Sequence, residues 1–503
     1  MAGARTLVLA NGAAAPLAQV PELPAAAFRE LVAGAAHHGR RVSALSCRPR
    51  GDRRHELMVV VAADLDGVVE LARTTVDGDH HPSLTPECPQ VHMFEREMAE
   101  QWGLIPDGHP WLKPVRFQPA RRPGAGDRPR PTIGVTDFYR IEGDEIHEVA
   151  VGPVHAGVIE PGHFRFQCHG ELVMHLEISL GYQHRGVERA LAGGPDKRSL
   201  HYAETLAGDT TVGHAIAYCQ AVEGLSGAGV PARAQALRAV GLELERLANH
   251  TGDLGALAGD VGFLPTASFC GRLRGDYLNL TAELCGNRFG RALVRPGGVG
   301  FDLEAAQAGA MADRLDAAYG DTASAARLLW NTSSVMARFE DTGRVSAELA
   351  RTIGLVGPAA RASGLKRDVR KSHPSSYYRF AHIPISTWSS GDVFARAYVR
   401  WLEIQRSVDF VRGVLRTLPG GGVRAEAGPL RPEHVCVSLV EGWRGELCHV
   451  AITDARGRFA DYKVVDASFH NWTGLAMALR DQQISDFPLC NKSFNLSYCG
   501  NDL

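Results

Sequence analysis

Two histidines in glycine-rich turns are the leading candidates for acid–base chemistry in this 503-residue sequence. His155 lies in the segment 152–163 and His184 in the segment 180–189, and the glycines of both segments permit tight turns. An imidazole ring gains or loses a proton near neutral pH, so both side chains are predicted to handle protons. Neither belongs to an H-E-x-x-H motif, and metal binding by these histidines is not favoured.

The segment 204–214 carries polar groups but no thiol. It reads E-T-L-A-G-D-T-T-V-G-H, with Ala207 and Thr210 at the two positions that a C-x-x-C motif would use. The ten cysteines of the chain are widely spaced, and no two of them have the C-x-x-C spacing of zinc and iron–sulfur sites. Most of the cysteines are therefore expected to be buried, reduced thiols.

The bulk composition argues against several classes of function. The formal net charge is -2, which gives no support for nucleic-acid binding, because that requires clustered Lys and Arg. No apolar stretch reaches the roughly 18 residues of a membrane-spanning helix, so we expect no transmembrane segment, and we expect no signal peptide. The sequence also lacks the glycine-rich motifs that bind NAD or ATP phosphates.

A segment rich in proline, glycine and arginine divides the chain. Residues 119–132 contain almost no apolar side chains and are predicted to form a linker between a module at 1–118 and a domain at 133–503. In the first module the β-branched run 57–63 predicts a buried strand, and the run 24–35 predicts a helix. The first module is therefore expected to be α+β.

The second domain is expected to begin with β structure. Residues 163–169 and 171–178 flank Gly170, which predicts a hairpin. The apolar residues of its second strand recur at period two, so one face of that strand is expected to be buried; they are Leu172, Met174, Leu176 and Ile178.

Helical patterns dominate beyond residue 198. Apolar residues spaced three and four apart from Phe394 to Leu418 predict a long helix that starts at Asp392 and has one apolar stripe, and residues 419–422 end it. The segments 448–453 and 461–465 return to β structure. The fold class is therefore predicted as α+β, with an α+β module followed by a mainly helical bundle that carries peripheral β-hairpins.

Several motifs in one order resemble a known family. The segments G-P-V-H-A-G-V-I-E-P-G-H-F-R-F at 152–166 and L-G-Y-Q-H-R-G-V-E at 180–188 resemble the large subunits of membrane-bound, energy-converting nickel–iron hydrogenases. They also resemble the 49-kDa subunit of respiratory complex I. Further matching segments follow in the same order at 215–223, 295–299, 391–396, 441–446 and 486–498.

The first module resembles the 30-kDa subunit of complex I. The resemblance lies in F-E-R-E-M-A-E-Q-W-G-L at 94–104 and G-H-P-W-L at 108–112. Considered alone, the run 95–103 predicts a short helix with a solvent-exposed acidic face. The large subunits of hydrogenase 4 and formate hydrogenlyase fuse the two modules in this order, and the predicted linker falls at the fusion point.

The resemblance implies a nickel–iron centre held by four thiolates from two C-x-x-C motifs. In this sequence Ala207 and Thr210 replace the first pair, and Leu496 stands three residues before Cys499 in the second. Cys490 does not restore the spacing. No nickel–iron centre is therefore expected, and no resident cofactor is assigned to this chain.

Quinone chemistry is the next expectation from the resemblance. Complex I relatives use a histidine in the first glycine-rich loop and a tyrosine near the cysteine positions. His155 matches the histidine, whereas Gly208 occupies the position of the tyrosine. Asp209 offers a different proton donor. The candidates for proton or quinone handling are therefore His155, His184 and Asp209.

The leading hypothesis is an electron-transfer large subunit of a membrane-associated, ion-translocating oxidoreductase complex, with a quinone as the candidate electron acceptor. The resemblance implies a small iron–sulfur subunit whose cluster donates electrons, antiporter-like membrane subunits, and a peripheral place on the cytoplasmic face of the membrane. Two alternatives are kept. One is a structural scaffold with a vestigial cavity, and the other is an active nickel–iron hydrogenase.

Overall fold

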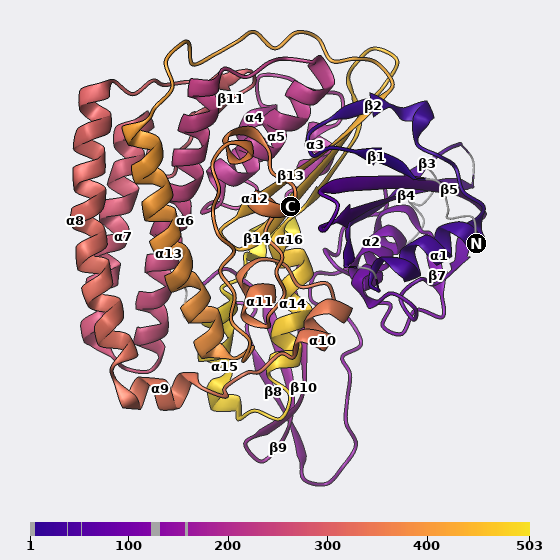
Figure 1. Cartoon of the computed structure of the whole chain (residues 1–503). Coiled ribbons are helices and arrows are strands. Elements are labelled where there is room, and N and C mark those ends of the chain that lie inside the picture. Colours follow the sequence, from indigo (N-terminus) through magenta and orange to yellow (C-terminus); the bar gives the residue numbers. More distant parts are fainter. Residues whose placement is uncertain (1–5, 38, 52, 122–130, 156–158) are drawn as a thin grey trace.

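The computed structural model describes residues 6–37, 39–51, 53–121, 131–155 and 159–503 (Figure 1). The N-terminal module is built on an antiparallel sheet with the strand order β1-β5-β4-β3, against which two helices pack. A short parallel pair, β6 and β7, lies beside it. These elements are β1 (Leu7–Leu9), α1 (Ala25–Ala35), β3 (Arg40–Pro49), β4 (Arg54–Ala63), β5 (Val68–Asp77), β6 (His80–Pro82), α2 (His92–Trp102) and β7 (Ile105–Asp107). The predicted helix and buried strand of this module are confirmed.

A second antiparallel sheet lies between the N-terminal module and the helices (Figure 1). Its strand order is β15-β14-β13-β2, and β2 reaches it from the N-terminal part of the chain. Alternate residues of β13 face different cores: Val435 and Val437 pack with the N-terminal module, whereas Cys436 and Val440 pack with the helices. The strands are β2 (Ala14–Pro16), β13 (His434–Gly442), β14 (Gly445–Thr453) and β15 (Phe459–Val465).

Long helices form the layer on the other side of this sheet. The outer helices α7 and α8 pack against each other, and α6 packs against both α7 and α13 (Figure 1). The long helices are α5 (Thr211–Ser226), α6 (Ala232–Asp260), α7 (Leu264–Cys285), α8 (Ala305–Trp330) and α13 (Val393–Arg416). The α+β fold class, with a mainly helical second part, is confirmed.

Short elements connect the two sheets and the bundle. The short helices are α3 (Val187–Leu191), α4 (Ser199–Glu204), α9 (Ser333–Phe339), α10 (Ala347–Thr352), α11 (Gly357–Ala362), α12 (Val369–Ser372), α14 (Ala467–Ala478), α15 (Phe487–Phe494) and α16 (Tyr498–Asp502). The single 3-10 turns are η1 (Leu17–Gln19), η2 (Pro89–Val91), η4 (Ser376–Arg379) and η5 (Ile484–Asp486), and β11 (Val294–Arg295) pairs with β12 (Gly298–Val299).

Helix α13 begins where the sequence predicts. The side chain of Asp392 accepts a hydrogen bond from the backbone N–H of Ala395 at 2.8 Å, which caps the helix. The expectation of a single apolar stripe is too narrow, because charged side chains on other faces of the helix are also buried. These are Arg396, Arg400 and Glu403, and each finds a polar partner inside the protein.

The predicted hairpin is present, but its buried face differs from the prediction. It consists of β9 (His163–His169) and β10 (Leu172–Ser179), with β8 (Ile146–Val151) on the other edge of β9. The pairing register shifts between Val173 and His175. This irregularity buries Val173 and leaves Leu172 and Met174 exposed, whereas the alternating pattern placed those two inside.

The expectation of a solvent-exposed acidic face on the helix at 95–103 is wrong. Helix α2 buries Glu95 and Glu97. Glu95 accepts hydrogen bonds from the hydroxyls of Ser83 and Thr85, at 2.7 and 2.6 Å. These two carboxylates are tolerated in the interior because polar partners compensate the loss of hydration.

The second buried carboxylate of α2 joins the two parts of the chain. Lys463 on β15 lies 2.7 Å from Glu97 and 2.9 Å from Glu188 on α3. Arg116 also pairs with Glu97. Burial alone raises the pKa of Glu188, but Lys463 and neighbouring arginines outweigh it and lower that pKa. A buried ionic cluster therefore lies between the N-terminal module and the sheet β13–β15.

Residues 122–130 of the predicted linker lie outside the described residues, and the linker and module boundaries stay predictions. Within the described part of the chain, none of the helices combines the length and the apolar character needed to cross a membrane.

Replacement of Lys463 by methionine is expected to destabilise the protein by about 3 kcal/mol, because two buried carboxylates lose a shared cation. The thermal midpoint of the purified chain measures this loss. Lys197→Met, at an exposed lysine, is the matched control and should leave the midpoint unchanged. Equal midpoints for Lys463→Met and wild type would contradict the role of the cluster.

Candidate functional site

Four segments that are distant in sequence converge around the C-terminal helix α16. The guanidinium group of Arg185 donates hydrogen bonds to the carbonyl oxygens of Thr205, Leu206 and Cys499, at 2.5, 2.9 and 3.2 Å. The Cys499 thiol lies beside the Glu160 carboxylate and the backbone of Gly208. The loops at 159–163, 181–186 and 204–210 and the C-terminal residues therefore share one region.

His184 is held by the C-terminal helix. Its Nδ1 donates a hydrogen bond to the carbonyl oxygen of Asp502 at 2.7 Å, which fixes the ring and its tautomer. The carboxylate of Asp502 accepts hydrogen bonds from the backbone N–H groups of Gly181 and Gln183, each at 2.9 Å. Burial lowers the pKa of His184, so the neutral imidazole is favoured.

His155 has a ring nitrogen with no partner. Its Nε2 is buried and forms no hydrogen bond within the part of the chain that the structure describes. The ring packs near Phe164, with 5.9 Å between ring centroids. The turn that carries His155 requires glycine at position 152, where φ is +88° and a Cβ atom would collide with the carbonyl oxygen of Gly162. The following residues, 156–158, lie outside the described residues.

Asp209 forms a two-point ion pair with Arg444. The distances from the guanidinium nitrogens to the two carboxylate oxygens are 2.6 and 2.7 Å. The backbone carbonyl of Asp209 also accepts hydrogen bonds from Trp443 Nε1 at 2.9 Å and Asn249 Nδ2 at 3.0 Å. Burial alone raises the pKa of Asp209, but Arg444 outweighs it and lowers that pKa. The carboxylate is therefore ionised, and a proton-donor role for Asp209 stays a prediction.

The positions that lack cysteines are closely packed. Ala207 and Thr210 are buried, and the N–H of Thr210 donates to the carbonyl of Ala207 at 2.9 Å. Cys490 is buried on α15 near Arg396, and burial raises the pKa of its thiol to about 12. Burial also raises the pKa of Cys499, to about 11. At neutral pH both side chains are therefore thiols and not thiolates.

Glu245 is a site residue that sequence reasoning missed. Its carboxyl group accepts hydrogen bonds from the backbone N–H groups of Val212 at 2.7 Å and Gly213 at 3.2 Å, at the start of α5. Burial raises its pKa to about 8, and the charge of Asp209 contributes in the same direction. The sequence gives no local signal for this residue, because Glu245 lies in α6 within an ordinary apolar and acidic run.

A buried chain of side chains was also missed. His214 Nε2 lies 3.1 Å from Asp466 Oδ2, and His214 Nδ1 lies 3.1 Å from His449 Nε2. His449 Nδ1 in turn lies 2.9 Å from the hydroxyl of Tyr462. Burial lowers the pKa of His449 well below its ordinary value, so this ring is neutral. His214 was visible as the end of the 204–214 segment, but its partners lie more than 200 residues away.

Comparison with known proteins identifies the class. The family model "Respiratory-chain NADH dehydrogenase, 49 Kd subunit" matches residues 260–434, and the model for the 30 Kd subunit matches residues 24–121. The fold and these matches define an oxidoreductase subunit of electron transport. The chain belongs to the family of respiratory-chain NADH dehydrogenase 30-kDa and 49-kDa subunits and related hydrogenase subunits, with the two modules fused in that order. The resemblance predicted from the sequence is confirmed.

Individual relatives come from both branches of this family. Formate hydrogenlyase subunit 5 of Escherichia coli (strain K12) is 30% identical over 451 residues, which cover 86% of this chain and 78% of the relative. Carbon monoxide-induced hydrogenase of Rhodospirillum rubrum is 31% identical over 350 residues, covering 69% of this chain and 97% of the relative. An NADH-quinone oxidoreductase subunit of Solibacter usitatus (strain Ellin6076) is 28% identical over 338 residues, covering 67% of this chain and 91% of the relative.

Substitution Asp209→Asn is expected to lower stability at pH 7 by about 1–2 kcal/mol, a modest loss because the Asp209 side chain is 33% exposed. A carboxylate with a lowered folded-state pKa stabilises the fold above its unfolded pKa, near 3.8, and this contribution disappears as pH falls further. The difference in thermal midpoint between variant and wild type should therefore shrink from pH 7 toward pH 3.

The exposed carboxylate of Asp313 on α8 provides the control for this measurement. Asp313→Asn should match wild type at both pH values. A difference for Asp209→Asn that stays constant between pH 7 and pH 3 would mean that the ion pair with Arg444 is not its source.

Proposed function

We propose that this chain is the electron-transfer large subunit of a membrane-associated, ion-translocating oxidoreductase complex, and that it works without a nickel–iron centre. The names of its relatives, which include hydrogenases and NADH-quinone oxidoreductase subunits, support the first part. The observation that carries the second part is the pair Ala207 and Thr210, which are buried where the resemblance places two thiolate ligands.

The donor set of this region does not suit a nickel–iron centre. Such a centre requires soft thiolate ligands, and neither a methyl group nor a neutral hydroxyl replaces them. Leu496 supplies no donor, and Cys499 is one thiol. Asp209 is occupied by Arg444. Within the described residues there is also no cluster of three or more His, Cys, Asp or Glu side chains arranged to hold a metal ion.

A quinone is the electron acceptor that the side chains support best. Reduction of a quinone to a hydroquinone consumes two electrons and two protons. The Nε2 of His155, which has no hydrogen-bond partner among the described residues, can form a hydrogen bond with a quinone oxygen. His184 and Asp209 are already engaged, with Asp502 and Arg444, so in this proposal they shape the site. The electrons would come from an iron–sulfur cluster in a small partner subunit.

The proposed function also implies which subunits this chain contacts and where the complex lies. The chain would pack against the small iron–sulfur subunit and connect, through other subunits of the complex, to antiporter-like membrane subunits. It would sit as a peripheral subunit on the cytoplasmic face of the membrane. The names of the relatives support membership of such assemblies, since one of them is a membrane-bound hydrogenase subunit.

Metal analysis of the purified chain tests the absence of the nickel–iron centre. Nickel is expected far below one atom per chain, because the chain offers too few thiolate donors. Nickel near one atom per chain would overturn the proposal and favour the hydrogenase alternative.

Substitution of His155 tests the quinone reaction in the purified complex. With the iron–sulfur clusters reduced beforehand, added ubiquinone-1 should reoxidise them, and His155→Gln should slow this step by about a hundredfold if the ring supplies a proton or hydrogen bond to the quinone. His382→Gln, at an exposed histidine, is the control and should leave the rate unchanged.

The scaffold alternative predicts a different result. In that case His155→Gln leaves reoxidation unchanged, whereas deletion of residues 1–118 prevents assembly of the complex. This combination would replace the enzymatic role with a structural one.

A further inference from the structure

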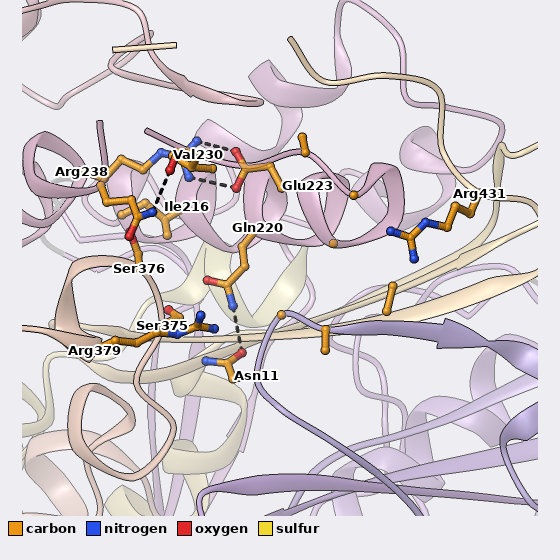
Figure 2. A pocket seen from close by; sticks show the side chains of 17 residues that line it. Asn11, Ile216, Gln220, Glu223, Val230, Arg238, Ser375, Ser376, Arg379 and Arg431 are labelled. Atoms are coloured by element: carbon orange, nitrogen blue, oxygen red, sulfur yellow. Dashed lines mark hydrogen bonds and ion pairs between the residues drawn. The ribbon is translucent and has the colours of Figure 1, made fainter. Parts of the chain in front are cut away.

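A cavity of about 420 Å³ lies on another part of the molecule, where three stretches of chain meet (Figure 2). Its walls come from residues 11–14, from the helices α5 and α6 with the turn between them, and from η4 with Ser375. Arg431 lines one further side. The volume lies within the range of about 300–1,000 Å³ that is typical of small-molecule sites.

Among the described residues that line the cavity, the one acidic side chain is neutralised. Glu223 forms a two-point ion pair with Arg238, at 2.5 and 3.0 Å, and also accepts a hydrogen bond from the N–H of Gly297 at 2.8 Å. The Arg238 guanidinium donates further to the carbonyl oxygens of Arg295 and Gly298. This pair is buried and satisfied within the protein, so it contributes no net charge to a ligand.

Two guanidinium groups of the cavity remain without a carboxylate. Arg379 makes one long hydrogen bond, from Nε to the carbonyl of Pro374 at 3.4 Å. Neither Arg379 nor Arg431 forms a salt bridge with any residue in the described part of the chain. Figure 2 shows them on opposite sides of Gln220. The lining of the cavity therefore has two separated positive charges and no free negative one.

The backbone at Gly12 leaves space for the side chain of Gln220, which lies between Arg379 and Arg431 (Figure 2). Gly12 has a φ of +78°, and a Cβ atom there would come within 2.6 Å of Gln220 Nε2. Gln220 donates to the Oδ1 of Asn11 at 2.9 Å. Asn11 is fixed by three hydrogen bonds to the backbone, at 2.8 Å each: its Nδ2 donates to the carbonyls of His373 and Leu439, and its Oδ1 accepts from the N–H of Leu439. The Gln220 side chain is thus held in place across the middle of the cavity.

A second glycine makes room for one of the cations. Gly227 ends α5 with a φ of +75°, and a Cβ atom there would approach Arg431 Nη2 to 2.5 Å. The absence of a side chain at this position leaves space for the Arg431 guanidinium at the rim of the cavity.

Ser376, in the wall of the cavity, has a strained backbone and a hydroxyl group without a hydrogen-bond partner among the described residues. Its φ of +52° places it in the left-handed region, which is uncommon for serine. Its hydroxyl is buried and has no hydrogen-bond partner in the described part of the chain. Strained backbone at a cavity wall together with an unsatisfied donor is typical of a binding site.

We propose that this cavity binds a small organic dianion whose two anionic groups, carboxylate or phosphate, pair with Arg379 and Arg431. Guanidinium groups bind both kinds of anion through charge-assisted hydrogen bonds. The central part of the ligand faces Gln220 and the hydroxyls of Ser375 and Ser376. Because residues 11–14 and α5 both line the cavity, the ligand bridges the N-terminal part of the chain and the helical part.

Isothermal titration calorimetry with the full chain tests the site directly, using succinate, glutarate and 3-phosphoglycerate as ligands with two anionic groups and acetate as the ligand with one. At least one dianion is expected to bind with a dissociation constant below about 1 mM. Acetate should bind at least about tenfold more weakly, and added salt should weaken dianion binding. The thermal midpoint should rise with the dianion that binds.

Single substitutions at the two cations should each weaken this binding by about tenfold or more, since each removes one charge-assisted contact. The variants are Arg379→Gln and Arg431→Gln, and the double variant should abolish binding. Arg456→Gln, at an exposed arginine that lines none of the cavities described above, is the matched control. Because Arg379 and Arg431 are exposed, all variants should have the wild-type thermal midpoint without ligand, which separates loss of binding from loss of fold.

Binding of the dicarboxylates alone, or of the phosphate ester alone, supports the site and identifies the anionic group. Three results would overturn the proposal: no dianion binds, the double variant binds as wild type does, or the cavity binds only acidic peptides from a partner subunit. None of these results depends on electron transfer, so the outcome is independent of the function proposed for the C-terminal region.

Discussion

The structure depends on one sheet that is buried on both faces. Strands β13, β14 and β15 separate the core of the N-terminal module from the core of the helical layer, and alternate side chains of β13 and β14 enter each core. Strand β2 extends this sheet from the N-terminal side. Burial of apolar surface on both faces is worth about 25 cal/mol per Å² and leaves little freedom for the sheet to shift relative to either core. This shared sheet therefore fixes the position of the N-terminal module relative to the helical layer.

The same sheet positions the candidate site. The turn between β13 and β14 holds Trp443 and Arg444, and both reach Asp209 in the segment before α5. Gly445 adopts a φ of +135°, and a Cβ atom there would come within 2.8 Å of Gly357. This close approach lets α11 support the turn from behind. The ion pair of Asp209 is thus determined by the packing of the turn between β13 and β14, which lies more than 200 residues further along the chain.

Local patterns in the sequence were enough to predict most helices and strands, but they did not predict the polar contacts between them. The strand at 57–63, the helix starting at Asp392 and the hairpin around Gly170 follow from periodicity, caps and glycine. The exposure of Met174 could not be predicted from these patterns, because a register shift changes which side chains of β10 face the core. The burial of Glu97 does not follow either, because its partner Lys463 lies 366 residues away. Likewise, no single segment contains both Glu245 and the helix start that it caps.

Asp209 is the one charged residue at positions 207–210, and its ion pair determines its protonation state. Asp209 is paired with Arg444, and Ala207 and Thr210 are neutral, so no unpaired negative charge is left in this segment. Glu245 has no comparable cation, and with a pKa of about 8 it carries a proton at pH 7. The two carboxyl groups hold different protonation states because Arg444 lowers the pKa of Asp209, whereas burial and the charge of Asp209 raise the pKa of Glu245 and outweigh its backbone N–H donors. Near neutral pH the Glu245 carboxyl group on α6 therefore holds a proton, whereas the Asp209 carboxyl group is ionised.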